Sequence, residues 1–161
     1  MIRRAISQDA AAIAGIWNPY IRDSAVTFNS AEKPVDEVAA LIRDRDAAGF
    51  ATFVAEGAGG IAGFASYSQF RGGVGYARSM EHTVLLSPAA RGKGFGRALM
   101  QAVEDHARAG GAHCLFAGVS AENPEGRAFH ARLGFAEAAI LREVGFKFGR
   151  YMDLVLMQKF L

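Results

Sequence analysis

The chain has 161 residues, of which 51% are apolar and 21% charged, so we expect one folded globular domain over residues 1–161 and not a disordered chain. It has no apolar run near the ~20 residues of a membrane helix and no apolar leader with a cleavage site, so we expect neither a membrane anchor nor a signal peptide. The net charge of +2 is small and its positive part gathers at residues 91–97, which favours a small anionic ligand over nucleic acid. The single cysteine, Cys114, excludes an internal disulfide and fits the reducing cytoplasm.

The N-terminal part of the chain predicts a strand and two helices. Residues 2–6 predict a short strand, and the apolar spacing over residues 13–20 predicts a helix that Pro19 should end or kink. Pro34 suits the first residue of a second helix, which should end at Gly49. The buried stripe of this second helix should consist of Val35, Val38 and Ile42.

The rest of the chain predicts strands that first form a hairpin and then alternate with helices. Residues 50–56 and 60–70 predict two strands joined by the turn GAGG. Later strands are expected at 80–86 and 113–119, and helices are expected after residues 94 and 122. Two last strands are expected near 135–141 and 151–158, on either side of REVGFKFGR. This order predicts an α/β fold, in which helices cover both faces of a mixed sheet.

The segment SPAARGKGFGRALM, residues 87–100, places a basic, glycine-rich turn between a strand and a helix. The first N–H groups of a helix are unpaired and its dipole adds about half a positive charge, so such a turn can hold a phosphate group. A P-loop would need Gly-Lys-Ser/Thr, which this segment lacks. A dinucleotide fingerprint needs glycine at the first, third and sixth positions, whereas Gly92, Gly94 and Gly96 are first, third and fifth. The spacing therefore favours a phosphate ligand of another kind.

The same residues carry a resemblance to a known family. RGKGFG resembles the Q/R-x-x-G-x-G/A signature of the GNAT N-acetyltransferases, with Arg91, Gly94 and Gly96 at the defining positions. The blocks ASYSQFR, MEHTVLL, ENPEGRAFHARLGF and GFKFGRYMDLVLMQ resemble the branch that acetylates phosphinothricin and methionine sulfoximine or sulfone. The resemblance implies a mixed, mostly antiparallel sheet of about seven strands flanked by helices, acetyl-CoA as co-substrate, and a homodimer. It implies cofactor contacts at Val84, Leu85, Leu86, Arg91, Gly92, Lys93, Gly94, Phe95, Gly96, Arg97 and Asn123.

Glu81 and His130 are the candidate catalytic residues. Strand alternation places Glu81 and Thr83 on one face, and His82 and Val84 on the other. A carboxylate at Glu81 can accept the proton of an attacking amine through water, although an exposed strand-end residue is the plainer alternative. His130 stands where many GNAT enzymes have a tyrosine that protonates the leaving thiolate, and a packed helix histidine is the alternative there. We expect no metal, because no ligand spacing links His82, His106, His113 and His130.

Two arginines precede Glu81 in a glycine-rich connection and suggest a clamp for an anionic acceptor. Guanidinium groups bind carboxylate or phosphinate bidentately, which favours Arg71; for Arg78 a solvated loop residue is equally expected. The resemblance implies an acceptor site formed by Phe28, Arg71, Gly72, Gly73, Arg78, Glu81, His82 and Thr83, and a subunit interface near Lys147, Arg150 and Tyr151. Acetylation of protein N-termini or aminoglycosides is one alternative function, and a non-catalytic acyl-CoA sensor is another.

Overall fold

The computed structural model describes residues 1–161 and contains one seven-stranded sheet in the order β1-β2-β3-β4-β5-β7-β6. All neighbouring strands are antiparallel except β4 and β5, so the expected mixed, mostly antiparallel sheet is confirmed. The strands are β1 (Ile2–Arg4), β2 (Ala51–Gly57), β3 (Gly60–Gln69), β4 (Ser79–Leu86), β5 (Cys114–Ser120), β6 (Ala136–Lys147) and β7 (Arg150–Phe160). The helices are α1 (Ala10–Asp23), α2 (Val35–Ala47), α3 (Phe95–Ala109) and α4 (Pro124–Arg132). None of them combines the length and apolar character that a membrane crossing requires.

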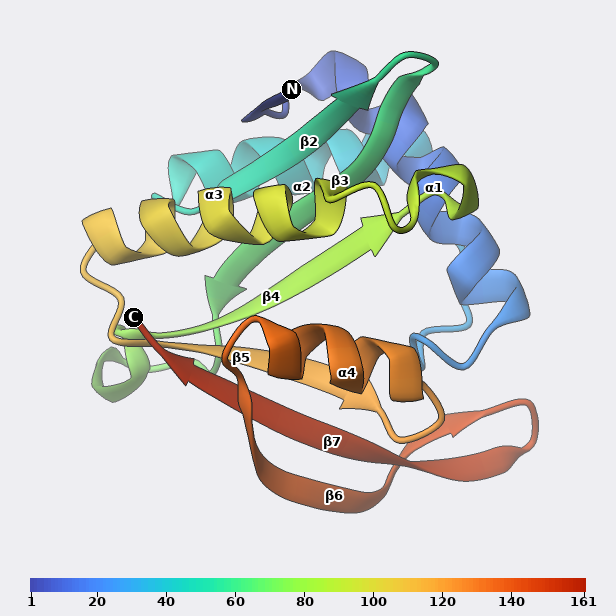
Figure 1. Cartoon of the computed structure of the whole chain (residues 1–161), viewed down its shortest axis with the longest axis vertical. Helices are drawn as coiled ribbons and strands as arrows, with labels where there is room; N and C mark the ends of the chain where they lie inside the picture. The colour runs from blue at the N-terminus through green and yellow to red at the C-terminus, as the bar shows by residue number, and fades with distance from the viewer.

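Two apolar cores hold the helices on opposite faces of the sheet. In Figure 1, α3 and α4 lie in front of the sheet, whereas α2 lies behind it. The front core joins α3 to the sheet through residues such as Tyr67, Leu99 and Leu115. The rear core joins α1 and α2 to the opposite face of β2, β3 and β4, through residues such as Val54 and Phe64. Because Phe64 and Tyr67 lie three positions apart in β3, strand alternation places them on opposite faces.

The two central strands, β4 and β5, separate along their length. They are in register only over Ser79–His82 and Cys114–Ala117. Beyond that point β4 continues to Leu86 beside β3, and β5 continues to Ser120 beside β7. Figure 1 shows the two strands diverging from left to right. The edge of β4 that faces this gap therefore carries backbone N–H and C=O groups without a strand partner, which a ligand can use.

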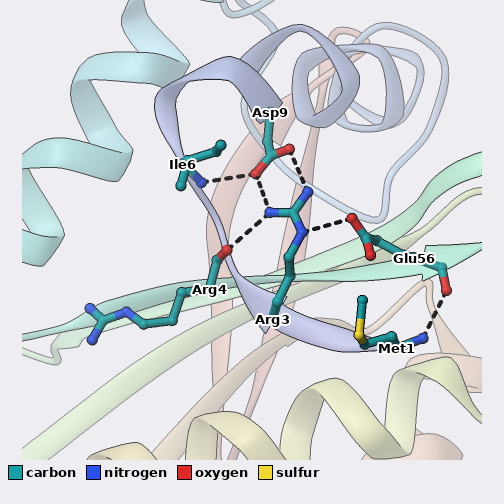
Figure 2. A network of polar contacts seen from close by, with 6 residues as sticks. All are labelled: Met1, Arg3, Arg4, Ile6, Asp9 and Glu56. Carbon is teal, nitrogen blue, oxygen red and sulfur yellow. Dashed lines mark hydrogen bonds and ion pairs between the residues drawn. The ribbon is translucent and has the colours of Figure 1, made fainter.

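Figure 2 shows how the first nine residues are fixed to the sheet. The Arg3 guanidinium donates from Nε to Glu56 Oε1 at 2.7 Å, and from Nη1 and Nη2 to the two Asp9 oxygens at 2.8 and 2.9 Å. Asp9 Oδ2 also accepts from the Ile6 backbone N–H at 2.8 Å, and the Met1 amino group donates to the Glu56 carbonyl at 2.9 Å. The hydrogen bond from Arg3 is the largest cause that holds the pKa of Asp9 below its ordinary value. The network thereby fixes the start of α1 against β2.

The helices depart from the sequence-based expectations at two positions. Pro19 lies inside α1, which continues to Asp23 because the neighbouring Trp17 and Ile21 are buried in the rear core and hold the helix across the proline. Val35 was expected in the buried stripe of α2, but its side chain is 50% exposed because it opens the first helical turn, away from the sheet. The other two predicted positions of that stripe are buried as expected.

The C-terminal hairpin is longer than the sequence pattern predicts. The segment REVGFKFGR was expected between two strands, but most of it belongs to β6, and the chain turns only at Phe148 and Gly149. The register of β6 with β7 shifts between Leu141 and Gly145, and the Glu143 backbone N–H within this bulge donates to Asp153 Oδ1 at 2.8 Å. A bulge of this kind interrupts the alternation from which strands are predicted.

Candidate active site

The gap between β4 and β5 contains two cavities that share a wall. The smaller has a volume of about 200 Å³ and reaches α1 and the loop after it, while the larger, about 550 Å³, extends to the N-terminus of α3 and to α4. Both are lined by Val26, Val84, Leu85, Asn123 and His130. We call the larger one the wide cleft and the smaller one the inner cavity. These shared lining residues show that the two cavities adjoin at the middle of the sheet.

The glycine-rich loop forms one end of the wide cleft. Gly92 and Gly94 have φ values of +73° and +82°, a left-handed conformation that favours glycine, and Gly94 immediately precedes the first residue of α3. A Cβ at Gly96 would lie only 3.0 Å from the Phe129 ring, so this glycine lets α3 and α4 approach closely. These glycines line the wide cleft together with Arg91 and Arg97. The backbone therefore has the shape of an anion site at the start of a long helix.

Two residues of this motif lie elsewhere. Lys93 is exposed at the tip of the loop, and Phe95 packs on the front core with its ring 3.4 Å from the position of a Cβ at Gly57. Neither residue lines the wide cleft, and a cofactor contact through their backbone amides, which the family resemblance implies, stays a prediction. Phe95 faces the front core because it is the first residue of α3, and its side chain packs the start of the helix on the sheet.

Tyr20 is a residue of the site that sequence reasoning did not identify. Its hydroxyl donates to the Leu86 carbonyl at 2.7 Å and accepts from Arg91 Nη2 at 2.9 Å. This chain of bonds ties α1 to the end of β4 and orients the Arg91 guanidinium at the rim of the wide cleft. In the sequence, Tyr20 belongs to the apolar spacing over residues 13–20, which predicts only a buried helix face. Its hydroxyl was the one feature of the sequence that could have suggested a polar role.

Glu81 and Thr83 face the rear of the sheet, as alternation predicts, because their register partners Ser68 and Ser66 share the face of Phe64. Glu81 itself lines neither cavity, but its Oε2 lies 3.9 Å from the position of a Cβ at Gly118, which lines the inner cavity. The Glu81 side chain remains in contact with solvent, yet the surrounding protein removes enough water to raise the pKa of its carboxyl, against the opposing effect of Arg45. A carboxylate with a raised pKa next to a residue that lines a cavity is a candidate general base.

His82 and His130 form a buried pair on the opposite face. Their Nε2 atoms are 2.9 Å apart, and His130 Nδ1 lies 2.8 Å from the Gly126 carbonyl. A carbonyl only accepts, so His130 Nδ1 carries hydrogen and its Nε2 accepts from His82 Nε2–H. Burial lowers the pKa of both imidazoles, and the charge of His130 lowers that of His82 further. Both rings are therefore neutral near pH 7, and in these tautomers His130 has no free N–H for the thiolate.

The two predicted clamp arginines do not line either cavity. Arg71 and Arg78 are exposed in the connection between β3 and β4, together with Gly72 and Gly73. The Arg71 guanidinium lies over the Tyr76 ring, 5.4 Å from its centroid. Phe28, Thr83 and His82, in contrast, line the inner cavity, and Asn123 lines both cavities while its Oδ1 accepts from the Gly126 N–H at 3.0 Å.

The C-terminal hairpin holds the loop that carries Phe28. Lys147 was expected at a subunit interface, but its side chain is buried, and Nζ donates to the Ser24 and Thr27 carbonyls at 2.6 and 2.9 Å. The Phe28 ring packs on Gly145, where a Cβ would lie only 2.3 Å from it. Two segments more than 100 residues apart thereby form one wall of the inner cavity. Arg150 pairs with Glu122 of the same chain, and Tyr151 is exposed.

Comparison with known proteins agrees with this architecture. Residues 16–135 match the model of the acetyltransferase (GNAT) family. The L-amino acid N-acyltransferase MnaT of Escherichia coli K12 is 37% identical over 157 residues, which is 98% of this chain and 91% of that protein. The L-methionine sulfoximine/L-methionine sulfone acetyltransferase of Salmonella typhimurium LT2 is 36% identical over 98% of this chain and 92% of its own length. The structure of yncA, a putative acetyltransferase from Salmonella typhimurium with its cofactor acetyl-CoA, superposes with a TM-score of 0.95 at 36% identity and covers 100% of this chain and 93% of that one. The chain therefore belongs to the acetyltransferase (GNAT) family.

Proposed function

We propose that the protein transfers the acetyl group of acetyl-CoA to the α-amino group of a small amino-acid-like acceptor, of the methionine sulfoximine, methionine sulfone or phosphinothricin type. The observation that carries this proposal is the pair of adjoining cavities between β4 and β5: the wide cleft has an anion site at its end, and the Glu81 carboxylate lies behind Gly118, which lines the inner cavity. The relatives that act on amino acids and their sulfoximine or sulfone analogues support the acceptor class.

Acetyl-CoA fits the wide cleft by its chemistry. The loop from Arg91 to Arg97 offers backbone N–H groups, a helix N-terminus and two guanidinium groups for a pyrophosphate. From there a pantetheine arm would follow Val84–Leu86, whose edge toward β5 has no strand partner. The same backbone N–H groups would stabilise the oxyanion that forms when the thioester carbonyl is attacked. Gly126 and Asn123 lie on the α4 side of this path.

The transfer itself needs a base and a source of a proton. We assign the base to Glu81, which accepts a proton from the ammonium group of the acceptor so that the neutral amine can attack the thioester carbonyl. The C–N bond then forms, the nitrogen releases its second ammonium proton to water, the C–S bond breaks to give the amide, and the thiolate takes up a proton. His130 lines both cavities but its two nitrogens are engaged with His82 and Gly126, so we assign this last proton to water and an orienting role to the histidine pair.

The decisive experiment is an amine panel with acetyl-CoA, followed by thiol release. The panel contains methionine sulfoximine, methionine sulfone, phosphinothricin, an N-terminal peptide and an aminoglycoside. We expect turnover with the amino-acid analogues, and a loss of about 10²–10⁴-fold in Glu81→Gln with acetyl-CoA affinity unchanged. Glu137→Gln, an exposed carboxylate of β6, is the matched control. Preference for the peptide or the aminosugar would refute the acceptor class, and acetyl-CoA binding without any turnover would make the protein a sensor.

We further propose that two copies of the chain associate through the C-terminal hairpin and that the protein acts in the cytoplasm. This hairpin carries several large exposed apolar side chains: Ile140, Leu141, Val144, Phe146, Phe148 and Tyr151. Several large exposed apolar side chains within one hairpin are typical of a protein contact. Light scattering that gives the mass of a dimer would support the proposal, whereas a monomer at working concentration would refute it.

A further inference from the structure

We propose that Arg45, on α2, binds the carboxylate of the acceptor and thereby selects free amino acids over their uncharged derivatives. The inference rests on the proposed function, because it assumes that the acceptor's amine lies beside Glu81. It assigns the anionic head to a residue outside the sequence motifs. Arg71 and Arg78, which the sequence suggested for this role, stand in an exposed loop.

The guanidinium of Arg45 lacks a partner of opposite charge. Its only hydrogen bond goes from Nη1 to the hydroxyl of Ser66, which in turn contacts Thr52 Oγ1 at 2.8 Å. No carboxylate oxygen lies within 4.0 Å of it, in contrast to the arginines that form the ion pairs of the surface. The Arg45 side chain is half-buried, and removal of water lowers its pKa, while the charge of Glu81 opposes this effect. A partly desolvated cation with unused N–H donors is ready to bind an anion.

The register of the sheet brings this cation close to the inner cavity. Ser66 lies directly opposite Thr83, and Ser68 lies opposite Glu81, so these four side chains share the rear face. Thr83 lines the inner cavity, and adjacent strands are only about 4.8 Å apart. Arg45 lines neither cavity itself, but its guanidinium bonds to Ser66, on the strand next to the one that carries Thr83. It stands on the same face as the proposed base.

The charges in the cavity explain why such a cation is needed. The carboxylate of an α-amino acid stays within about 4 Å of its own amine, because only two bonds join the two groups through Cα. An acceptor whose amine approaches Glu81 therefore also brings its carboxylate close to Glu81, and the two negative charges repel each other. Arg45 lies on the same rear face of the sheet as Glu81, so its positive charge can offset the repulsion between the two carboxylates. An amide or ester of the same amino acid has no such charge and gains nothing from Arg45.

Arg45 could instead act only through Glu81, by favouring its ionised form. The two roles make different predictions. A carboxylate anchor changes the turnover of free acids and leaves their amides unaffected, whereas a change in the ionisation of Glu81 lowers the turnover of both alike and shifts the pH profile of both. The ratio of kcat/KM for the free acid to that for its amide therefore separates them, and the intrinsic pKa of each amine cancels when variants are compared.

The test measures this ratio for methionine sulfone and its carboxamide in the wild type, Arg45→Met, Arg45→Lys and Arg71→Ala. Arg43→Met, an exposed arginine two residues earlier on the same helix, is the matched control. We expect Arg45→Met to lower the ratio of kcat/KM for the free acid to that for the amide about 10- to 100-fold, with the KM of acetyl-CoA unchanged. Arg45→Lys should retain part of the preference, and it keeps the test available if the methionine variant does not fold.

Three results would overturn the inference. The first is an equal loss for acid and amide in Arg45→Met, which would assign Arg45 to Glu81. The second is a loss of acid preference in Arg71→Ala with none in Arg45→Met, which would restore the loop arginine. The third is a wild type that acetylates acid and amide equally well, which would leave the proposed function intact and remove the anchor. A wild type that acetylates neither would refute the proposed function itself.

Discussion

A single methyl group at Gly145 should disturb the acceptor site without touching it. In Gly145→Ala the new Cβ would lie 2.3, 2.6 and 2.6 Å from three atoms of the Phe28 ring. The ring must withdraw by about 1.2 Å to reach the ~3.5 Å of ordinary carbon contacts. Overpacking of this kind costs about 1–3 kcal/mol of unfolding free energy, more than the ~0.5–1 kcal/mol that alanine gains over glycine in a strand. We therefore expect a net loss of stability together with a displaced wall of the inner cavity.

The assay is a double-mutant cycle in which denaturant unfolding and thiol release are measured on the same four proteins. Gly145→Ala should raise the KM of the acceptor and leave that of acetyl-CoA unchanged, because Phe28 lines the inner cavity and not the wide cleft. In a Phe28→Ala background the ring is absent, so the stability cost of Gly145→Ala should disappear. If Gly145→Ala costs the same with and without the Phe28 ring, the contact is not the cause and the reasoning fails.

Three further predictions concern other parts of the molecule. Lys147→Met leaves the Ser24 and Thr27 carbonyls without their donor, so it should destabilise the fold by about 1–3 kcal/mol and raise only the KM of the acceptor. An equal rise in the KM of acetyl-CoA, measured by steady-state kinetics, would argue against a local effect. Gly94→Ala requires an alanine to adopt the left-handed backbone angle of φ +82°, at a cost of about 1–2 kcal/mol. Calorimetry should show weaker acetyl-CoA binding with the fold intact, and an unchanged affinity would refute the anion site. The pKa of Asp9 in the folded protein lies below its ordinary value of 3.8. The ionised carboxylate therefore contributes its full stabilisation above pH 3.8, and this stabilisation is lost as the pH falls through the folded pKa. Asp9→Asn should be less stable than the wild type at pH 7, and the difference in unfolding free energy should vanish in acid. A pH-independent difference would show that packing, not the Arg3 ion pair, causes the loss.

The sequence predicts the local parts of the site well and the distant contacts poorly. The turn at residues 91–97 could be found because its chemistry is continuous in the chain: a strand end, glycines and a helix start. The opposite faces of Glu81 and His82 also follow from alternation along one strand. Arg45 could not be found in this way, because it lies in the charged run RDRD of α2 and resembles a solvated helix face until the register of β3 with β4 is known.

The same reason explains the misjudged residues of the C-terminal hairpin. Lys147 follows an aromatic, basic pattern that is typical of a surface, and only the fold shows that its ammonium group caps two carbonyls of the loop after α1. Pro19 was judged by its own conformational preference, whereas burial on both sides of it decides the course of α1. In each case a contact made across a long sequence separation overrides the local signal.

The short seam between β4 and β5 has a consequence for how stable the protein is inside a cell. Four residue pairs join the two strands, and beyond these pairs the two halves of the sheet are separated by the gap described above. A cofactor that lies in this gap contacts both halves and binds only the folded chain, so by mass action it adds RT ln(1 + [L]/Kd) to the free energy of unfolding. At a hundred times Kd this amounts to about 2.7 kcal/mol. The equilibrium fraction of folded protein should therefore rise and fall with the concentration of the acetyl donor.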